Sequence, residues 1–393
     1  MRTEVLRMVE APRRSVERAA NTRRVLAALG PQGRLTQAEL GTATGLSRPT
    51  LTAILGDLGA AGWVTSGPPA TDRHGAGRPA RVFGVDPDAV LVAGVDVGVH
   101  TVRAVVADLT GTVRAHHETT VAAHAPGDRR LAVVQDVLLK SCHAAEVDLD
   151  RLAALCVGVP GIVDASGRIR RSTVVPDWSG RHVGHELEQW SARPVEIVND
   201  ANLAAVGEHW RGAARGTDDV VYLHVGRRTS AGLLLGGRVH TGRTGGAGEI
   251  GAIPALFVDN VKVLLGETAA ADDARVPEVF AAAAAGEPTA AARVEDLASR
   301  LARSVETLAH VLDPDVMVLG GGLSRAGRLL VEAVDRHVPV VDDLMPPLRL
   351  GELADTAVTL GGVRRALLRA AGQNPQLEVL LDDAGTRVEG RVS

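Results

Sequence analysis

A group of polar side chains opens a helical pattern near the N-terminus, where the chain reads Ser47-Arg-Pro-Thr-Leu-Thr52. Hydroxyls and a guanidinium on the first turns of a helix are groups that reach base edges in the major groove of DNA. Helix N-termini also attract phosphate through their unpaired N–H groups and the helix dipole. We therefore predict that a recognition helix begins here and presents Ser47, Arg48, Thr50 and Thr52.

Three helices would position this group. The recognition helix has one apolar face at i, i+3, i+4 and i+7, formed by Leu51, Ile54, Leu55 and Leu58. Thr36 and Glu39 have the spacing of a capping box, which predicts a second helix ending near Gly45. An earlier helix is predicted over Thr22–Leu29 from its apolar residues Val25, Leu26 and Leu29, and Pro31 and Gly33 end it.

Two short strands are expected after the recognition helix, around a loop rich in Gly and Pro. The strands lie within Gly62–Ser66 and Arg78–Val85, which is the pattern of a wing. In the loop, Gly75-Ala-Gly-Arg-Pro79 places Arg78 on a flexible backbone. An arginine delivered in this way suits the narrow, negative minor groove of A·T-rich DNA.

The charge of the chain is unevenly distributed. Residues 1–85 contain 12 Arg and no Lys against 6 acidic residues, which gives +6, whereas the remainder carries −10. A basic head suits a polyphosphate partner, and a solvated charged surface explains the charge equally well. Together with the wing, the pattern favours DNA binding over a three-helix protein-interaction module. The predicted phosphate contacts are Arg34, Arg73 and Arg81.

Beyond residue 86, apolar strands alternate with helices in two similar halves, which predicts α/β layers with a ligand cleft between the halves. The pair Asn199-Asp200 follows one of these strands. A carboxylate in that position can hydrogen-bond a ligand hydroxyl or accept its proton. The alternative role of Asp200 is the N-cap of the following helix.

The motifs in their order along the chain resemble those of the ROK family of repressors, uncharacterised reading frames and sugar kinases, and in particular its xylose- and N-acetylglucosamine-repressor branch. The matching segments are Leu46-Ser-Arg-Pro-Thr50, Gly77-Arg-Pro79, Gly94-Val-Asp-Val-Gly98, Gly158-Val-Pro-Gly161, Asn199-Asp-Ala-Asn202, Gly245-Gly-Ala-Gly-Glu-Ile-Gly251 and Gly320-Gly-Gly-Leu-Ser324. The resemblance implies an N-terminal winged helix-turn-helix followed by a two-lobed actin/hexokinase-like ATPase fold, with a sugar bound between the lobes. The expected divisions are 1–86, 87–210, 211–372 and a tail over 373–393.

Both phosphate loops of the family's kinases are altered in this chain. Where those kinases have Gly-Gly-Thr after the first Asp, the chain has Gly98-Val-His100. Where they have Gly-Thr-Gly-x-Gly, it has Gly226-Arg-Arg-Thr-Ser230. A β-branched side chain obstructs the close approach of backbone to phosphate that glycine permits. We therefore expect neither kinase activity nor a nucleotide cofactor.

The family's zinc motif is absent as well. Ala252 stands where the resemblance implies a histidine, and residues 253–267 contain no Cys or His, so we expect no metal. Apolar packing by Leu256, Phe257, Val261, Val263 and Leu264 is expected to fill that space. For the sugar, the resemblance implies contacts from Asn199, Asp200 and Glu249, with Glu267 as a replacement for the family's final glutamate through a shorter loop.

The remaining composition indicates a protein of the cytoplasm. No run of about 18 apolar residues is present, and the N-terminus has no apolar leader. The two cysteines, Cys142 and Cys156, do not form a disulfide framework.

Three hypotheses follow. The first is a homodimeric transcriptional regulator, usually a repressor, which binds a pseudo-palindromic DNA operator and responds to a sugar or sugar phosphate. The second is a sugar kinase with a DNA-binding head and Asp200 as its base. The third is a DNA-binding dimer that has no effector.

Overall fold

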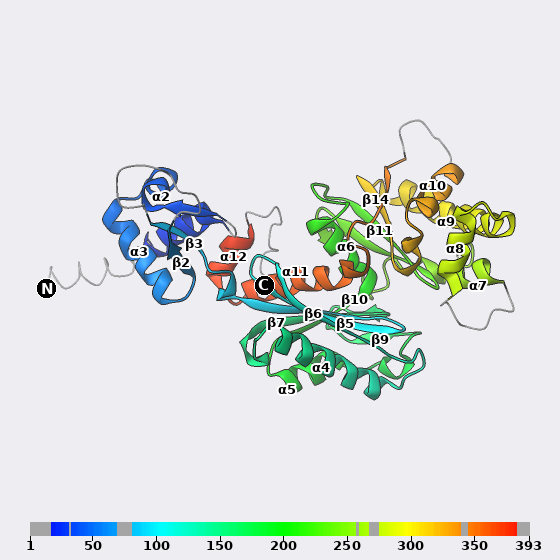
Figure 1. The fold of residues 1–393 in the computed structure, drawn as a ribbon, viewed down its shortest axis with the longest axis horizontal. Coiled ribbons are helices and arrows are strands. Elements are labelled where there is room, and N and C mark those ends of the chain that lie inside the picture. The colour runs from blue at the N-terminus through cyan, green and yellow to red at the C-terminus, as the bar shows by residue number, and fades with distance from the viewer. Residues whose placement is uncertain are drawn as a thin grey trace. The chain divides into compact units, whose positions relative to one another are not determined.

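The computed structural model describes residues 17–30, 33–68, 81–256, 259–266, 275–338 and 345–382 (Figure 1), with the side chains of residues 324 and 325 excepted. The chain divides into two compact units. The smaller unit comprises Met1–Val92, Ala107–Thr112 and Leu367–Ser393, and the larger comprises Ala93–Val106 and Val113–Ala366. None of the described helices is long and apolar enough to cross a membrane.

The N-terminal part of the smaller unit is a winged helix-turn-helix. A helix over residues 17–29 precedes β1 (Arg34–Thr36), α2 (Gln37–Thr44), α3 (Arg48–Ala60), β2 (Val64–Gly67) and β3 (Val82–Val85). Strand β3 pairs antiparallel with both β1 and β2. Both halves of the predicted capping box are made between Thr36 and Glu39, and Gly45 ends α2 in the left-handed conformation. The predicted apolar face of α3 is buried.

The chain returns to this unit at its C-terminal end. Helix α12 (Pro375–Asp382) buries Leu377, Leu380 and Leu381. Glu378 of α12 also forms an ion pair with Arg23 of the first helix, with 3.4 Å between the charged atoms. The tail predicted over 373–393 therefore contains the helix α12 and packs within the unit that contains the helix-turn-helix.

The larger unit begins with a five-stranded sheet of order β10-β7-β4-β5-β6. Its strands are β4 (Leu91–Val97), β5 (Thr101–Asp108), β6 (Val113–Thr120), β7 (Leu152–Val159) and β10 (Val195–Asn199), with β10 parallel to β7. Helices α4 (Gly127–Ala144) and α5 (Val183–Ser191) lie on one face of this sheet (Figure 1). Strands β8 (Ile162–Val163) and β9 (Ile169–Arg171) form a separate small ribbon. Every residue of β4 is buried, as its apolar sequence predicts.

A second five-stranded sheet has the order β13-β12-β11-β14-β15. Its strands are β11 (Val220–Val225), β12 (Thr229–Leu235), β13 (Arg238–Val239), β14 (Val316–Gly320) and β15 (Leu348–Leu350). On one face, alternate residues of β11 join a hydrophobic core with α7 (Asn260–Leu265), α8 (Val276–Ala284), α9 (Pro288–Leu312) and α10 (Arg328–His337). Helix α6 (Asp200–Arg211) contacts β11 and β12.

Helix α11 (Ala357–Ala371) packs against the backbone of two other elements without intervening side chains. A Cβ atom at Gly94 of β4 would lie 2.1 Å from the Thr359 carbonyl oxygen, and one at Gly207 of α6 would lie 2.3 Å from that of Ala357. Neither position has room for a methyl group, so the approach of α11 requires glycine at both. Residues from Leu367 onward belong to the smaller unit, so α11 continues from one unit into the other.

Replacing Gly207 with Ala should lower the free energy of unfolding by about 1–3 kcal/mol, because the added methyl group collides with backbone atoms that cannot rotate away. Urea titration followed by tryptophan fluorescence would measure the change. Gly322→Ala is the matched control, since no atom lies within 4 Å of the position of its Cβ. Equal midpoints for the two variants would contradict the contact.

Candidate functional site

The exposed face of α3 is the candidate nucleic-acid interface. Arg48, Thr52 and Ala53 are exposed there, opposite the buried leucines and isoleucine of the same helix. Within the described part of the chain, the Arg48 guanidinium forms no ion pair and is available to a partner. Arg34 and Arg81 are exposed as well. The predicted contacts Arg73 and Arg78 lie outside the described residues.

The three hydroxyls at the start of α3 are already hydrogen-bonded within the protein. Ser47 is the N-cap, and its Oγ lies 3.4 Å from the Thr50 amide nitrogen and 2.9 Å from Thr50 Oγ1. Thr52 Oγ1 donates to the Arg48 carbonyl oxygen over 2.9 Å. Gln37, which the sequence analysis did not single out, donates to Thr52 Oγ1 over 2.7 Å. The hydroxyls therefore fix the first turns of the helix, and their role in base reading stays a prediction.

The larger unit places Asn199 and Asp200 at the junction of β10 and α6. Asn199 is the N-cap of α6, because its Oδ1 accepts a hydrogen bond from the Asn202 amide over 3.0 Å. Its Nδ2 donates to the Gly161 carbonyl oxygen over 3.1 Å and to Asp200 Oδ1 over 3.2 Å. Asp200 is therefore not the N-cap, which was its alternative role, and Asn199 holds its carboxylate in place.

Several ionisable groups surround Asp200. Burial raises the pKa of Asp200, and the charge of His224 on β11 opposes that shift. Burial and the charge of Asp200 also raise the pKa of Glu249, against the Arg171 guanidinium. Asp200 and Glu249, both predicted ligand contacts, therefore interact electrostatically, because the charge of Asp200 raises the pKa of Glu249. Glu267, the fourth predicted contact, lies outside the described residues.

Asp96 and Arg103 extend this group, and the sequence analysis assigned no role to either side chain. Burial, reinforced by Asp200, raises the pKa of Asp96 to about 7, whereas Arg103 lowers it. Arg103 reaches Asp96 over 3.4 Å, Glu118 over 2.9 Å and Asp355 over 3.9 Å. One guanidinium thus lies among three carboxylates. The only signal in the sequence is a charged residue inside a strand that is otherwise apolar.

The turn at the first phosphate-loop position is closed by internal bonds. The Gly98 amide donates to the Thr101 carbonyl oxygen over 2.8 Å. The buried Arg130 guanidinium donates to the carbonyl oxygens of Gly98, over 2.5 Å, and Val99, over 3.2 Å. Val99 lies partly exposed in the turn, so its branched side chain occupies surface that a glycine would leave open.

The turn at the second position joins β11 to β12 as an ordinary hairpin. Asn260 Nδ2 donates to the Gly226 carbonyl oxygen over 2.8 Å and lies 3.1 Å from Thr229 Oγ1. Arg227 is paired with Asp259 over 3.2 Å. The side chains here bind one another, and Arg228 and Ser230 stand where the family's kinases have glycines.

Apolar side chains fill the region that corresponds to the family's zinc motif. Leu256, Val261 and Leu264 are buried in the core of the second sheet, and Val263 packs against them, as predicted. Phe257 lies outside the described residues. Among the described residues, no group of three or more His, Cys, Asp or Glu side chains has the arrangement of a metal site. Residues 253–267 contain no Cys or His, so this segment lacks the thiolate and imidazole ligands that bind a structural zinc ion.

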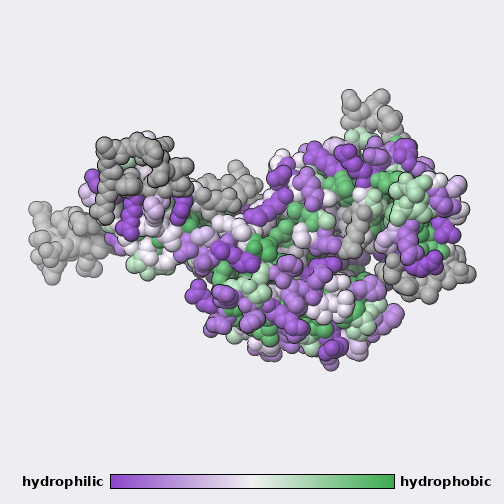
Figure 2. Space-filling view, viewed as in Figure 1, coloured by the Kyte–Doolittle hydropathy of each residue, from purple (hydrophilic) through white to green (hydrophobic). Residues whose placement is uncertain are grey.

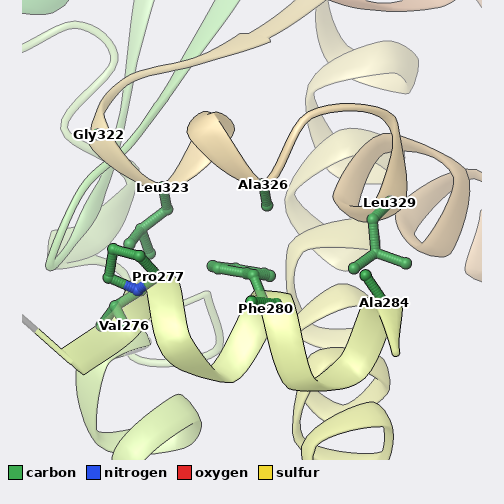
Figure 3. A pocket seen from close by; sticks show the side chains of 9 residues that line it. Val276, Pro277, Phe280, Ala284, Gly322, Leu323, Ala326 and Leu329 are labelled. Atoms are coloured by element: carbon green, nitrogen blue, oxygen red, sulfur yellow. The ribbon is translucent and has the colours of Figure 1, made fainter. Parts of the chain in front are cut away.

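A separate apolar pocket of about 300 Å³ lies in the larger unit, between α8, the turn Gly322–Ala326 and α10. In Figure 3 the Phe280 ring of α8 faces Ala326 across it. Its lining residues are Val276, Pro277, Phe280, Ala281, Ala284, Gly322, Leu323, Ala326 and Leu329. None of them carries a charge, so the pocket can accommodate an apolar or aromatic group but offers no side chain to a phosphate.

Comparison with known proteins identifies both parts of the chain. A family model described as ROK family matches residues 92–343, and one described as MarR family matches residues 20–73. The chain belongs to the ROK family. Its N-terminal part is a MarR-like winged helix-turn-helix, and its larger unit has the actin/hexokinase-like fold of ROK proteins.

Relatives of this ROK protein include both enzymes and regulators. It is 26% identical to a glucokinase of Halalkalibacterium halodurans over 68% of this chain and 92% of the relative. It is 22% identical to a xylose repressor of Caldicellulosiruptor bescii over 72% of this chain and 80% of the relative. The crystal structure of a ROK family transcriptional regulator, a homologue of the E. coli MLC protein, superimposes with a TM-score of 0.66 at 19% identity and covers 93% of this chain and 98% of its own.

Replacing Asp96 with Asn should stabilise the protein at pH 8 more than at pH 5. The folded carboxyl keeps its proton up to a pH of about 7, whereas an unfolded aspartate loses it at about 4. Wild-type stability therefore falls as pH rises between these values, and the amide removes that dependence. Urea unfolding of the wild type and of the single variant at both pH values would measure the difference in unfolding free energy. Arg103, Asp200 and Asp355 stay unchanged in both proteins. A change of equal size at pH 5 and pH 8 would contradict the raised pKa.

Proposed function

We propose that this ROK protein is a DNA-binding transcriptional regulator that represses carbohydrate-related genes and responds to a sugar or sugar-derived effector. The observation that carries the proposal is the helix-turn-helix, whose recognition helix α3 presents Arg48 on its exposed face. The basic charge of residues 1–85 supports a polyphosphate partner. The xylose repressor relative and the superimposed regulator structure support the same class.

The turns at the two phosphate-loop positions support regulation rather than catalysis. Phosphoryl transfer depends on backbone N–H groups and cations that hold the phosphates in line with the acceptor. Here Val99 occupies one turn, and Arg227 in the other is paired with Asp259. Asp200 keeps the position of a base, but both turns have lost glycines whose backbone N–H groups hold phosphates in the family's kinases.

The effector of this regulator would bind at Asn199, Asp200 and Glu249. The Asp200 carboxylate is held by a hydrogen bond from Asn199, and carboxylates make strong, directional contacts with hydroxyl groups. Helix α11 lies against α6, whose first residue is Asp200, and its last residues belong to the smaller unit. A ligand that shifts α6 relative to β4 would therefore act on a helix that enters the DNA-binding unit.

A homodimer would place two helix-turn-helix modules on one operator. Two-fold symmetry implies a pseudo-palindromic site whose half-sites lie one helical turn, or a multiple of it, apart. The wing residue Arg78 is proposed to enter the minor groove beside each half-site, and Arg34, Arg73 and Arg81 to contact phosphates.

Arg48→Ala should reduce affinity for the selected operator by about tenfold or more, the value of one good base contact of roughly 1–3 kcal/mol. Selection of bound sequences from random duplexes by the full-length protein would define the operator. Fluorescence anisotropy would then give dissociation constants at fixed salt concentration. The control is Arg151→Ala, an exposed arginine of the larger unit. If the wild type selects no sequence and ignores DNA at low ionic strength, the proposal fails.

If the effector site is correct, we expect one member of a panel of sugars and sugar phosphates to raise the melting temperature of the wild-type protein. The same compound should change the affinity of the protein for its operator. Glu249→Gln should weaken both responses, because an amide oxygen accepts hydrogen bonds less strongly than a carboxylate. Glu332→Gln, an exposed glutamate of α10, is the matched control. If no sugar changes the melting temperature or the operator affinity of the wild type, a DNA-binding dimer without an effector is the better description.

The kinase relatives define the second candidate, a sugar kinase with a DNA-binding head, because Asp200 retains the position of a base. We expect no ATP-dependent phosphorylation of the panel sugars. Phosphorylation by the wild type that disappears in Asp200→Asn would make this protein an enzyme.

A further inference from the structure

Gln37 bridges the two helices of the helix-turn-helix. It is the first residue of α2, directly after the N-cap Thr36, and its side chain is partly buried. Its Nε2 donates to the Arg48 carbonyl oxygen over 3.1 Å and to Thr52 Oγ1 over 2.7 Å. The Gln37 side-chain amide therefore reaches the N-terminal end of α3 from the neighbouring helix α2.

These two bonds use both N–H groups of the Gln37 amide. The Thr52 hydroxyl donates its own proton to the Arg48 carbonyl oxygen over 2.9 Å, so it has no proton left to donate. Oε1 of Gln37 and the remaining lone pair of Thr52 Oγ1 are thus acceptors, and Thr52 is exposed. The pair presents acceptors to a partner and no donor.

An acceptor-only pair discriminates between base edges. In the major groove, adenine N6 and cytosine N4 are donors, whereas guanine and thymine offer acceptors at the equivalent positions. Phosphate oxygens are acceptors too, so a phosphate contact would leave Gln37 Oε1 unpaired. These hydrogen bonds therefore favour adenine or cytosine, which present an amine in the major groove, over guanine, thymine and the phosphate backbone.

We propose that Gln37 is a specificity-determining residue of the operator interface and reads one adenine or cytosine as a unit with Thr52. This inference rests on the proposed DNA-binding function and deepens it. Without the bond from Gln37, Thr52 would face the groove with both lone pairs available, and the orientation of the Gln37 carbonyl would be lost.

The experiment repeats the sequence selection with full-length Gln37→Ala, Thr52→Val and the double variant. Each single variant should lose the preference for adenine or cytosine at the same one operator position, by about tenfold, the size of a base contact of roughly 1–3 kcal/mol. The double variant should lose no more than the larger single effect, because each change breaks the same bond. Affinity for non-specific duplex DNA should stay unchanged.

Thr42→Val is the matched control. Thr42 is an exposed threonine of α2 whose Oγ1 donates to the Ala38 carbonyl oxygen over 3.2 Å, the same intrahelical bond that Thr52 makes, so the substitution should preserve the full base preference. Melting temperatures of all variants would show whether α2 and α3 remain folded.

Two results would overturn the proposal that Gln37 and Thr52 read one base together. One is equal loss of affinity for every sequence in Gln37→Ala, which would mean that Gln37 only fixes α3. The other is additive losses at two different base positions. Both differ from failure of the proposed function, in which the wild type itself selects no sequence.

Discussion

The backbone contact of α11 with β4 and α6 is the constraint on which the larger unit depends. Gly94 and Gly207 allow α11 to approach until carbonyl oxygens occupy the places of side chains. Asp96 lies two residues after Gly94 on β4, and Asp200 is the first residue of the helix that contains Gly207. The packing therefore fixes the two elements that carry Asp96 and Asp200. Helix α11 then continues into the unit that contains the helix-turn-helix.

Burying carboxylates close together is costly unless cations or hydrogen bonds compensate for their charge. The protein meets this cost with Arg103 beside Asp96 and with the Asn199 amide beside Asp200. This compensation comes from side chains of the protein itself. It is incomplete, because the pKa values of the Asp96 and Asp200 carboxyls remain raised. Hydroxyl groups of the proposed effector would supply further donors.

Hydrophilic residues cover much of the face seen in Figure 2, and hydrophobic residues reach the surface there in separate groups. In the helix-turn-helix, the polar groups at the start of α3 already make hydrogen bonds within the protein. Ser47 caps the helix, Thr52 bonds to Gln37 and Arg48 keeps its guanidinium exposed. Ser47 contributes to the stability of α3, because the N-terminus of a helix has N–H groups that need acceptors.

Local patterns determined much of the structure from the sequence alone. The capping box at Thr36, the apolar face of α3 and the continuous apolar strand at β4 depend on residues close in the chain, whose periodicity specifies the buried face. The contacts of Gln37 with Thr52 and of Arg103 with Asp96 came only from the tertiary structure. These partners lie on different elements, and the angle and separation of packed elements decide whether two polar side chains meet.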